Sequence, residues 1–441
     1  MTFNQAPRGG LSLTGVVNWL LFFPLVCVYV VLVHFGSLFR FSAEENARGP
    51  STYIVLALVA LGIGRIARAF VTEKLIFWTL TALVIYVAVT TALLPLPLAA
   101  LNAPLEFAGY VLLAAAISRT RWRRSQISTI WILMAGGLLV SSSLTIVDYI
   151  GMIDVPYNNE ATTSTTAAGL KVWQASGFFP RRSGMAAFFG LSITGSLVLA
   201  LAHESFRARL YFLAAASSGL LCLFLTHNRS GVFAAIFVIA IYTLLSPRFK
   251  GSRRINILLG ASVAGGLLLT VVILLFPDHL TVYVAKLGFI GLADETWSSD
   301  RYRVDLFVAA IRSITENPLG NGFTKISLSS GLAMNPHNVV TAIIWATGIF
   351  SFIWLPLFAA AVYLALSGRL ENRSDRAPLR VESDALTFAL FAWLVGGMTH
   401  NILFTGLAWI MFGLMLSIRH FGDPEHAGTE INTGTVQQTT G

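Results

Sequence analysis

Charged residues and cysteines are scarce in this sequence. Only 12% of its 441 residues are Asp, Glu, Lys or Arg, whereas 55% are hydrophobic. This composition, with a mean hydropathy of +0.72, excludes an ordinary soluble domain. The two cysteines, Cys27 and Cys222, lie inside apolar runs, which excludes a disulfide framework and a cysteine-rich zinc site.

Motifs for several common chemistries are also missing. The polar segments on the predicted outer face hold no Asp-x-Asp pair and no His, Asp or Glu cluster with metal-ligand spacing. There is no Gly-x-Ser-x-Gly elbow of a hydrolase, no internal repeat and no coiled-coil heptad. We therefore expect no metal and no cofactor. A reaction on a phosphate-linked substrate would then rely on arginine where other enzymes use magnesium.

Long apolar runs predict an all-α polytopic membrane protein with about twelve transmembrane helices. The first run is long enough to cross the bilayer and lacks a small-residue cleavage site, so we expect a helix and not a signal peptide. Residues 1–420 then form a single integral membrane domain, and residues 421–441 form a disordered cytoplasmic tail. The expected spans are roughly 15–35, 51–70, 75–94, 104–118, 127–147, 183–202, 208–225, 231–246, 256–276, 338–366, 384–400 and 402–418.

The distribution of charge predicts the orientation of these spans, because basic residues concentrate on the cytoplasmic side. With the N-terminus inside, the inner segments hold 19 of the 30 basic residues but 9 of the 21 acidic ones. The sequence pI of about 9.8 is thus a signature of topology and not of nucleic-acid binding, which would need a basic patch on a soluble face. This orientation places the largest loop on the outer side of the membrane, which is the periplasm in a Gram-negative bacterium.

That loop, residues 277–337 between spans nine and ten, is where we expect the chemistry, because polar segments of membrane proteins are usually functional. Its centre, Val304–Ile314, has apolar residues at helical spacing, which predicts a short helix along the membrane surface. Arg301 and Arg303 are expected just before this helix, either as a solvated face or as phosphate ligands. The Asn-Pro-Leu-Gly-Asn-Gly run at 317–322 predicts a turn, since proline ends a helix and glycine allows a sharp reversal.

Arg229 lies in Thr-His-Asn-Arg-Ser-Gly, a connection of a few residues between two predicted spans. This position holds it at the outer membrane boundary. One interpretation is an arginine that anchors a helix end by extending its side chain to the interface. The other is a fixed guanidinium aimed at a lipid phosphate, because its planar fork binds phosphate oxygens in pairs and keeps its charge.

Three further outer residues are candidates for substrate binding. Arg181 and Arg182 begin span six from the outside, against the usual charge bias, so they either anchor the helix or contact a lipid phosphate. Glu106 follows a proline-rich turn near the outer end of span four. A carboxylate at that depth is costly unless it is paired, so we expect an arginine partner.

His337 sits where the loop meets span ten, after Pro336 and before Asn338. A lone histidine at a helix start is often structural. The positive charge of two nearby arginines would, however, disfavour its protonated form and leave a neutral imidazole able to accept a proton. A general base for an alcohol needs that property. Asn338 is a neighbouring candidate for substrate binding.

Three motifs now stand in order on the predicted outer face. Asn-Arg-Ser-Gly at 228–231 opens a span, and Arg303 is followed by Phe307 and then by Pro-Leu-Gly-Asn-Gly. His337 and Asn338 precede a span with Trp-Ala-Thr-Gly-Ile-Phe at 345–350. Together, over about residues 225–350, these motifs resemble the O-antigen ligase and Wzy-type polysaccharide polymerase superfamily. The sequence departs from the family pattern in having Phe307 where tryptophan is usual and Pro336 before the histidine.

The resemblance implies a metal-independent, inverting glycosyltransferase of O-antigen or exopolysaccharide biosynthesis. Its expected partners are an undecaprenyl-diphosphate-linked oligosaccharide, an acceptor glycan or lipid A core, and membrane lipids, with no nucleic acid. By the same resemblance, Arg229 and Arg303 would bind the diphosphate and His337 would act as the base. Phe307, four residues after Arg303, favours Arg303 over Arg301 for this role.

Two acceptors and one other class stay open. A polymerase transfers the growing chain to the next carrier-linked repeat unit, and a ligase of lipopolysaccharide biosynthesis transfers it to lipid A core. The segment from Arg303 to His337 is compact, with no extra subdomain for a large core, which favours the polymerase slightly. A flippase or transporter would need a polar network inside the bundle and often two related halves. Charges within the spans are scarce and the halves are dissimilar, so we place the transporter third.

Overall fold

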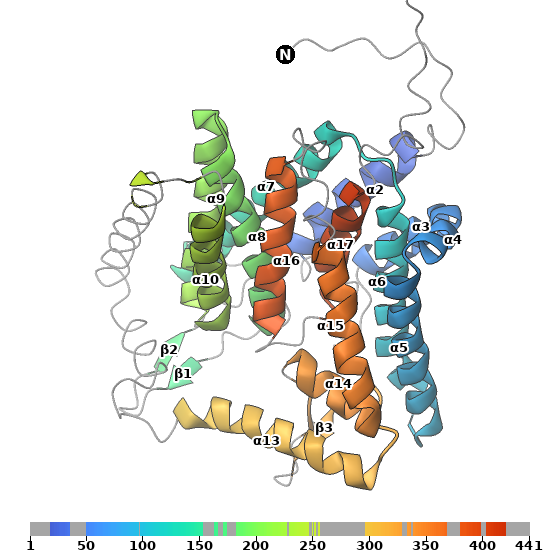
Figure 1. Cartoon of the computed structure of the whole chain (residues 1–441). Helices are drawn as coiled ribbons and strands as arrows, with labels where there is room; N and C mark the ends of the chain where they lie inside the picture. The colour runs from blue at the N-terminus through green and yellow to red at the C-terminus, as the bar shows by residue number, and fades with distance from the viewer. Residues whose placement is uncertain are drawn as a thin grey trace, which may run out of the picture.

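Helices cross between two ends of a bundle in the computed structural model, and α13 lies across one of these ends (Figure 1). The structure describes residues 18–35, 50–96, 98–152, 163–165, 171–173, 182–226, 229–246, 249, 251–252, 255, 296–328, 333–336, 338–367, 380–397 and 403–419.

The described segments are mainly helical, as the apolar runs predicted. Two short antiparallel hairpins also form, β1 (Thr163–Thr165) with β2 (Lys171–Trp173) and β3 (Ile326–Ser327) with β4 (Ala333–Met334). The helices are η1 (Asn18–Phe22), α2 (Phe23–Leu32), η2 (Val33–Phe35), α3 (Pro50–Leu61), α4 (Ile63–Thr72), α5 (Lys74–Leu93), η3 (Leu98–Leu101), α6 (Asn102–Ser118), α7 (Arg124–Tyr149), α8 (Arg182–Ala202), α9 (Phe206–Leu225), α10 (Arg229–Leu245), α13 (Thr296–Glu316), α14 (Val339–Thr347), η4 (Gly348–Phe350), α15 (Ser351–Ser367), α16 (Arg380–Gly397) and α17 (Gly406–Arg419).

Each predicted span except the ninth, 256–276, overlaps one of these helices, and the ninth lies outside the described residues. By length and composition, 4 of the described helices can cross a membrane, or up to 5 if the bent pair α3–α4 is one span. Shorter apolar helices cover residues 20–35, 102–118, 188–202, 231–245 and 406–418. The chain is therefore a multi-pass membrane protein, and the number twelve stays a prediction.

The second predicted span, 51–70, is not one straight helix. Its two halves, α3 and α4, meet at Gly62 with a bend of 71°. Gly62 packs so closely on α6 that a Cβ there would lie 2.5 Å from the Cβ of Ala116. Beyond the bend, Arg65 places its guanidinium 4.5 Å above the ring of Phe22. The hydropathy that predicted this span carries no signal for such a close helix approach, so it did not predict the bend.

The bundle core combines large aromatic residues with paired hydroxyl groups. Trp131, Trp393 and Trp409 are among its largest fully buried side chains. Between α7 and α9, the hydroxyls of Ser142 and Ser218 are 2.7 Å apart. Small hydroxyl residues allow helices to approach closely in a membrane and to satisfy one another's hydrogen bonds. Packing and not charge therefore holds this interior together.

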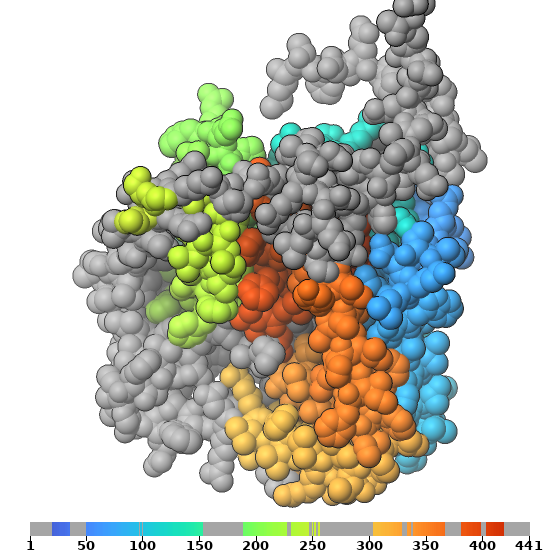
Figure 2. All heavy atoms as spheres, viewed as in Figure 1, coloured from blue at the N-terminus to red at the C-terminus, as the bar shows by residue number. Residues whose placement is uncertain are grey.

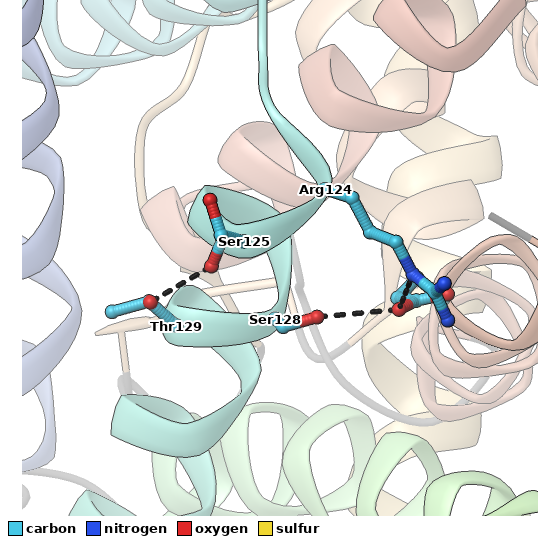
Figure 3. A network of polar contacts seen from close by, with 5 residues as sticks. Arg124, Ser125, Ser128 and Thr129 are labelled. Carbon is cyan, nitrogen blue, oxygen red and sulfur yellow. Dashed lines mark hydrogen bonds and ion pairs between the residues drawn. The ribbon is translucent and has the colours of Figure 1, made fainter. Parts of the chain in front are cut away.

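An ion pair joins α7 to α16 at the end of the bundle opposite α13 (Figures 1 and 3). Nε of Arg124 lies 3.1 Å from Oε1 of Glu382, and the Ser128 hydroxyl donates to the same oxygen at 3.2 Å. Glu382 is 7% exposed and Arg124 is 56% exposed. The pair joins the starts of α7 and α16, two helix ends that the charge distribution assigned to the same, inner side.

This asymmetry in exposure predicts which substitution costs more stability. Arg124→Ala leaves a buried carboxylate without its cation, so we expect a loss on the order of 1 kcal/mol. Glu382→Gln removes the buried charge and leaves an exposed guanidinium without its ion-pair partner, so the loss of stability should be smaller. Thermal unfolding of the detergent-solubilised variants measures both, and equal shifts in Tm would contradict the assignment of the cost to the buried carboxylate.

Candidate functional site

The predicted turn at 317–322 docks against the break between α14 and η4. The backbone N–H of Asn321 donates to the carbonyl of Trp345 at 2.8 Å, and that of Gly322 donates to Ala346 at 3.2 Å. In return, the N–H of Ile349 donates to the carbonyl of Pro318 at 2.9 Å. Two motifs that are separate in the sequence, 317–322 and 345–349, thus form one backbone hydrogen-bonded unit, which we call the glycine unit.

Glycine is required on both sides of this unit. Gly320, Gly322 and Gly348 have φ of 92°, 61° and 57°, which side chains rarely adopt. A Cβ at Gly320 would lie 2.3 Å from the carbonyl oxygen of Ala346, and one at Gly348 would lie 2.3 Å from that of Pro318. The turn predicted from Pro-Leu-Gly-Asn-Gly is confirmed. Its backbone N–H groups at 321 and 322 donate hydrogen bonds to carbonyls of α14.

The C-terminal half of α5 fixes this unit to the bundle. The Tyr86 hydroxyl donates to the carbonyl of Leu319 at 2.8 Å, and a Cβ at Gly322 would lie 2.0 Å from Oγ1 of Thr91. Sequence reasoning missed both α5 residues. Their signal was weak, namely a tyrosine and a threonine pair near the end of an otherwise apolar span.

Helix α13 packs on α14 through the apolar residues that the sequence singled out. Leu306 and Ala310 are buried in a cluster with Ile326 and Ile344, and the partly buried Val340 packs against them. The helix begins at Thr296, earlier than the predicted Val304, so Arg301 and Arg303 lie within it and not before it. The sequence hid this start because the apolar periodicity begins only at Val304, although no glycine or proline interrupts Thr296–Arg303.

The longer helix separates the two candidate arginines. Residues two apart on an α-helix point about 200° from each other, so Arg301 and Arg303 lie on opposite faces. Arg303 lies close to the helix face of Ala310, which is fully buried against α14, and it is itself half-buried. This placement favours Arg303 as the arginine held against the bundle.

Asn338 caps α14. Its Oδ1 accepts a hydrogen bond from the backbone N–H of Thr341 at 2.7 Å, so its amide carbonyl is already used. The cap fixes where the chain enters α14, directly after residue 337. His337 itself lies outside the described residues.

The remaining basic candidates lie at helix starts. Arg229 is the first residue of α10 and Arg182 the first of α8, and these two helices pack against each other. Both begin at the end of the bundle across which α13 lies (Figure 1). The structure describes their backbones only, and Arg181 lies outside the described residues.

Comparison with protein families supports the resemblance seen in the motifs. Residues 210–355 match the family model described as O-antigen ligase. This chain carries an O-antigen ligase domain. The match extends from α9 to the start of α15 and so includes the α13 helix, the glycine unit and α14. The resemblance seen in the motifs is thereby confirmed, while no curated protein matches the chain.

Glu106 lies outside the O-antigen ligase domain, near the start of α6. The hydroxyl of Tyr110 donates to its Oε1 at 2.8 Å, and Tyr29 is a hydrogen-bond partner of Tyr110. Tyr110 is thus one partner of Glu106, and the expected arginine partner stays a prediction. The next residue, Phe107, contacts the ring of Phe323 at 5.7 Å between centroids, so Glu106 lies close to the glycine unit of the domain.

Among the described residues, no group of three or more His, Cys, Asp or Glu side chains comes close enough to hold a metal ion. Metal independence of the O-antigen ligase domain is therefore still a prediction. It requires a direct measurement on the purified protein.

Proposed function

We propose that the chain is an inner-membrane glycosyltransferase whose site faces the periplasm. It moves a glycan from an undecaprenyl-diphosphate carrier to an acceptor hydroxyl. The O-antigen ligase domain and the multi-pass helical structure support this class.

One observation carries the assignment of the site. Arg303 lies one helical turn before Leu306, and Asn338, which follows His337 in the sequence, caps α14 two residues before Val340, while Leu306 and Val340 belong to the same α13–α14 contact. Because the glycine unit locks the far ends of these two helices together, the relative position of Arg303 and the entry to α14 is fixed. A preorganised cation next to a base is what transfer from a diphosphate requires.

The reaction we propose uses three residues. Arg229 and Arg303 bind the diphosphate and stabilise the charge that develops on it as the sugar–oxygen bond breaks. His337 takes the proton of the acceptor hydroxyl as its oxygen attacks the anomeric carbon. Displacement on one face inverts the anomeric configuration. The carrier bond is already activated, so neither a nucleotide nor a metal is needed.

Five residues would assist in binding the substrates. Arg181 and Arg182 would meet lipid phosphates, and Glu106 and Asn338 would meet sugar hydroxyls. Arg301, on the face of α13 away from Ala310, would contribute least of the five. The described part of the segment 303–338 contains one helix, one turn and a hairpin whose two strands have two residues each. This compactness favours a second carrier-linked repeat unit as the acceptor, which makes the protein a polymerase. The name of the matching family favours the alternative acceptor, lipid A core.

Removal of His337 should identify the reaction by what accumulates. Without a base, the neutral hydroxyl is a poor nucleophile, so His337→Ala should lower transfer roughly 10²–10⁴-fold and copy a gene deletion. We expect single lipid-linked repeat units on the outer face of the membrane, measured by extraction and mass analysis of carrier lipids. Transfer by the purified wild-type protein should persist in EDTA.

Three other outcomes would change the proposal. Long polymer on the carrier with none on lipid A core would select the ligase. Repeat units trapped on the cytoplasmic face would replace the enzyme by a flippase. Loss of activity in EDTA would restore a role for a metal.

A further inference from the structure

Helix α13 has two apolar faces, and one of them packs against α14 in the described part of the chain. Leu306 and Ala310 are buried against α14. A second stripe, at i, i+3, i+4 and i+7, remains open, with exposed fractions of 59%, 41%, 45% and 44% for Val304, Phe307, Val308 and Ile311. Four adjacent, exposed large apolar side chains on a polar-ended helix indicate a covering partner.

Lipid is the covering partner that the surroundings favour. The stripe runs toward Leu319, which is 53% exposed and is held by Tyr86. Tyr86 in turn contacts Phe350, at 5.6 Å between ring centroids, on the span that includes α14 and α15. In the space-filling view, the atoms of α13 and of α14–α15 form one continuous surface (Figure 2). Helix α13 therefore adjoins a helix that is long and apolar enough to cross a membrane.

The charges of α13 fit the same partner. Asp305, Arg312 and Glu316 are exposed and lie on a separate face of the helix. A helix with one apolar face and one charged face lies in the plane of a membrane interface, with the apolar face roughly 5–10 Å into the boundary between headgroups and acyl chains. A helix buried in protein would not keep this charged face open.

We propose that the 304/307/308/311 stripe of α13 sits in the lipid leaflet next to this end of the bundle. α13 is then joined to protein on one side and to lipid on the other. Because Arg303 borders this stripe, the lipid contact fixes the height of its guanidinium at the level of lipid phosphates. The role of Arg303 rests on the proposed function, whereas the lipid contact itself does not.

Spin labels test this directly. Single cysteines at Val308 and Ile311 on the stripe, and at Asp305 and Arg312 as matched controls on the charged face, are placed in full-length protein in which Cys27 and Cys222 have been replaced. The labelled protein is reconstituted in liposomes, and collision rates with oxygen and with a water-soluble nickel chelate are measured. Size-exclusion profiles confirm that each variant is folded.

The proposal expects oxygen to dominate at 308 and 311, at a depth of roughly 5–10 Å, and the nickel chelate to dominate at 305 and 312. High nickel collision rates at all four positions would overturn it, because the stripe would then face water. Low rates with both reagents at 308 and 311 would also overturn it and indicate a protein partner. The measurement reads contact with lipid and not transfer, so its failure is separate from failure of the proposed reaction.

Discussion

Arg303→Ala should lower glycan transfer by at least roughly 10²–10³-fold, the usual cost of removing one group that stabilises developing charge. The level of protein in the membrane should not change, because Leu306 and Ala310 still hold α13 on α14. Transfer from purified lipid-linked donor, normalised to protein recovered from membranes, gives the result. Arg303→Lys should recover little activity, since a lysine ammonium group does not replace the bidentate contact of a guanidinium with two phosphate oxygens.

Arg301→Ala is the matched control for this prediction. It removes the same charge from the same helix, two residues away and on the opposite face, so it should retain most of the activity. Full activity in Arg303→Ala combined with loss in Arg301→Ala would reverse the assignment. Activity in both variants would remove the diphosphate clamp from the mechanism.

The sequence predicted the features of α13 that depend on hydrophobic periodicity and missed those that depend on its neighbours. Helical spacing predicted a helix over Val304–Ile314, which is confirmed, but it did not predict that Leu306 and Ala310 pack against α14. The start at Thr296 did not follow, because the first two turns are polar and have no periodic signal. This matters for function, since only the longer helix places positions 301 and 303 on opposite faces.

The bend at Gly62 and the contact at Gly320 show a second limit of prediction from sequence. In both places a glycine is needed because another chain segment lies too close for a Cβ, Ala116 in one case and the Ala346 carbonyl in the other. A sequence shows that a glycine is present but not what approaches it. The motif at 317–322 could therefore be assigned as a turn, while its partner on α14 could be found only in three dimensions.

The lock between the glycine unit and α14 should be the most sensitive structural feature of the domain. Gly320→Ala adds strain of about 1–2 kcal/mol from its φ of 92° alone, and it forces a Cβ to within 2.3 Å of the Ala346 carbonyl oxygen. Because that oxygen belongs to the backbone, it cannot move aside without opening α14. We expect a large fall in the Tm of the solubilised protein together with loss of transfer.

Gly190→Ala, inside α8, is the matched control, since a Cβ there meets nothing within 4 Å and the substitution favours a helix. Its Tm should be unchanged or higher.

Gly322 offers a sharper test of the same lock, because its nearest obstacle is a side-chain atom. A Cβ at Gly322 would lie 2.0 Å from Oγ1 of Thr91, so Gly322→Ala should destabilise the protein. Thr91→Ala removes Oγ1 but keeps the Cβ at 2.9 Å, so the double variant should restore only part of the loss. Residues in contact show such coupling, whereas distant ones add independently. Thr91→Ala should give no rescue of Gly320→Ala, whose obstacle is backbone. Equal behaviour of the two double variants would show that α5 does not hold the loop, and the fixed position of Arg303 would lose its structural basis.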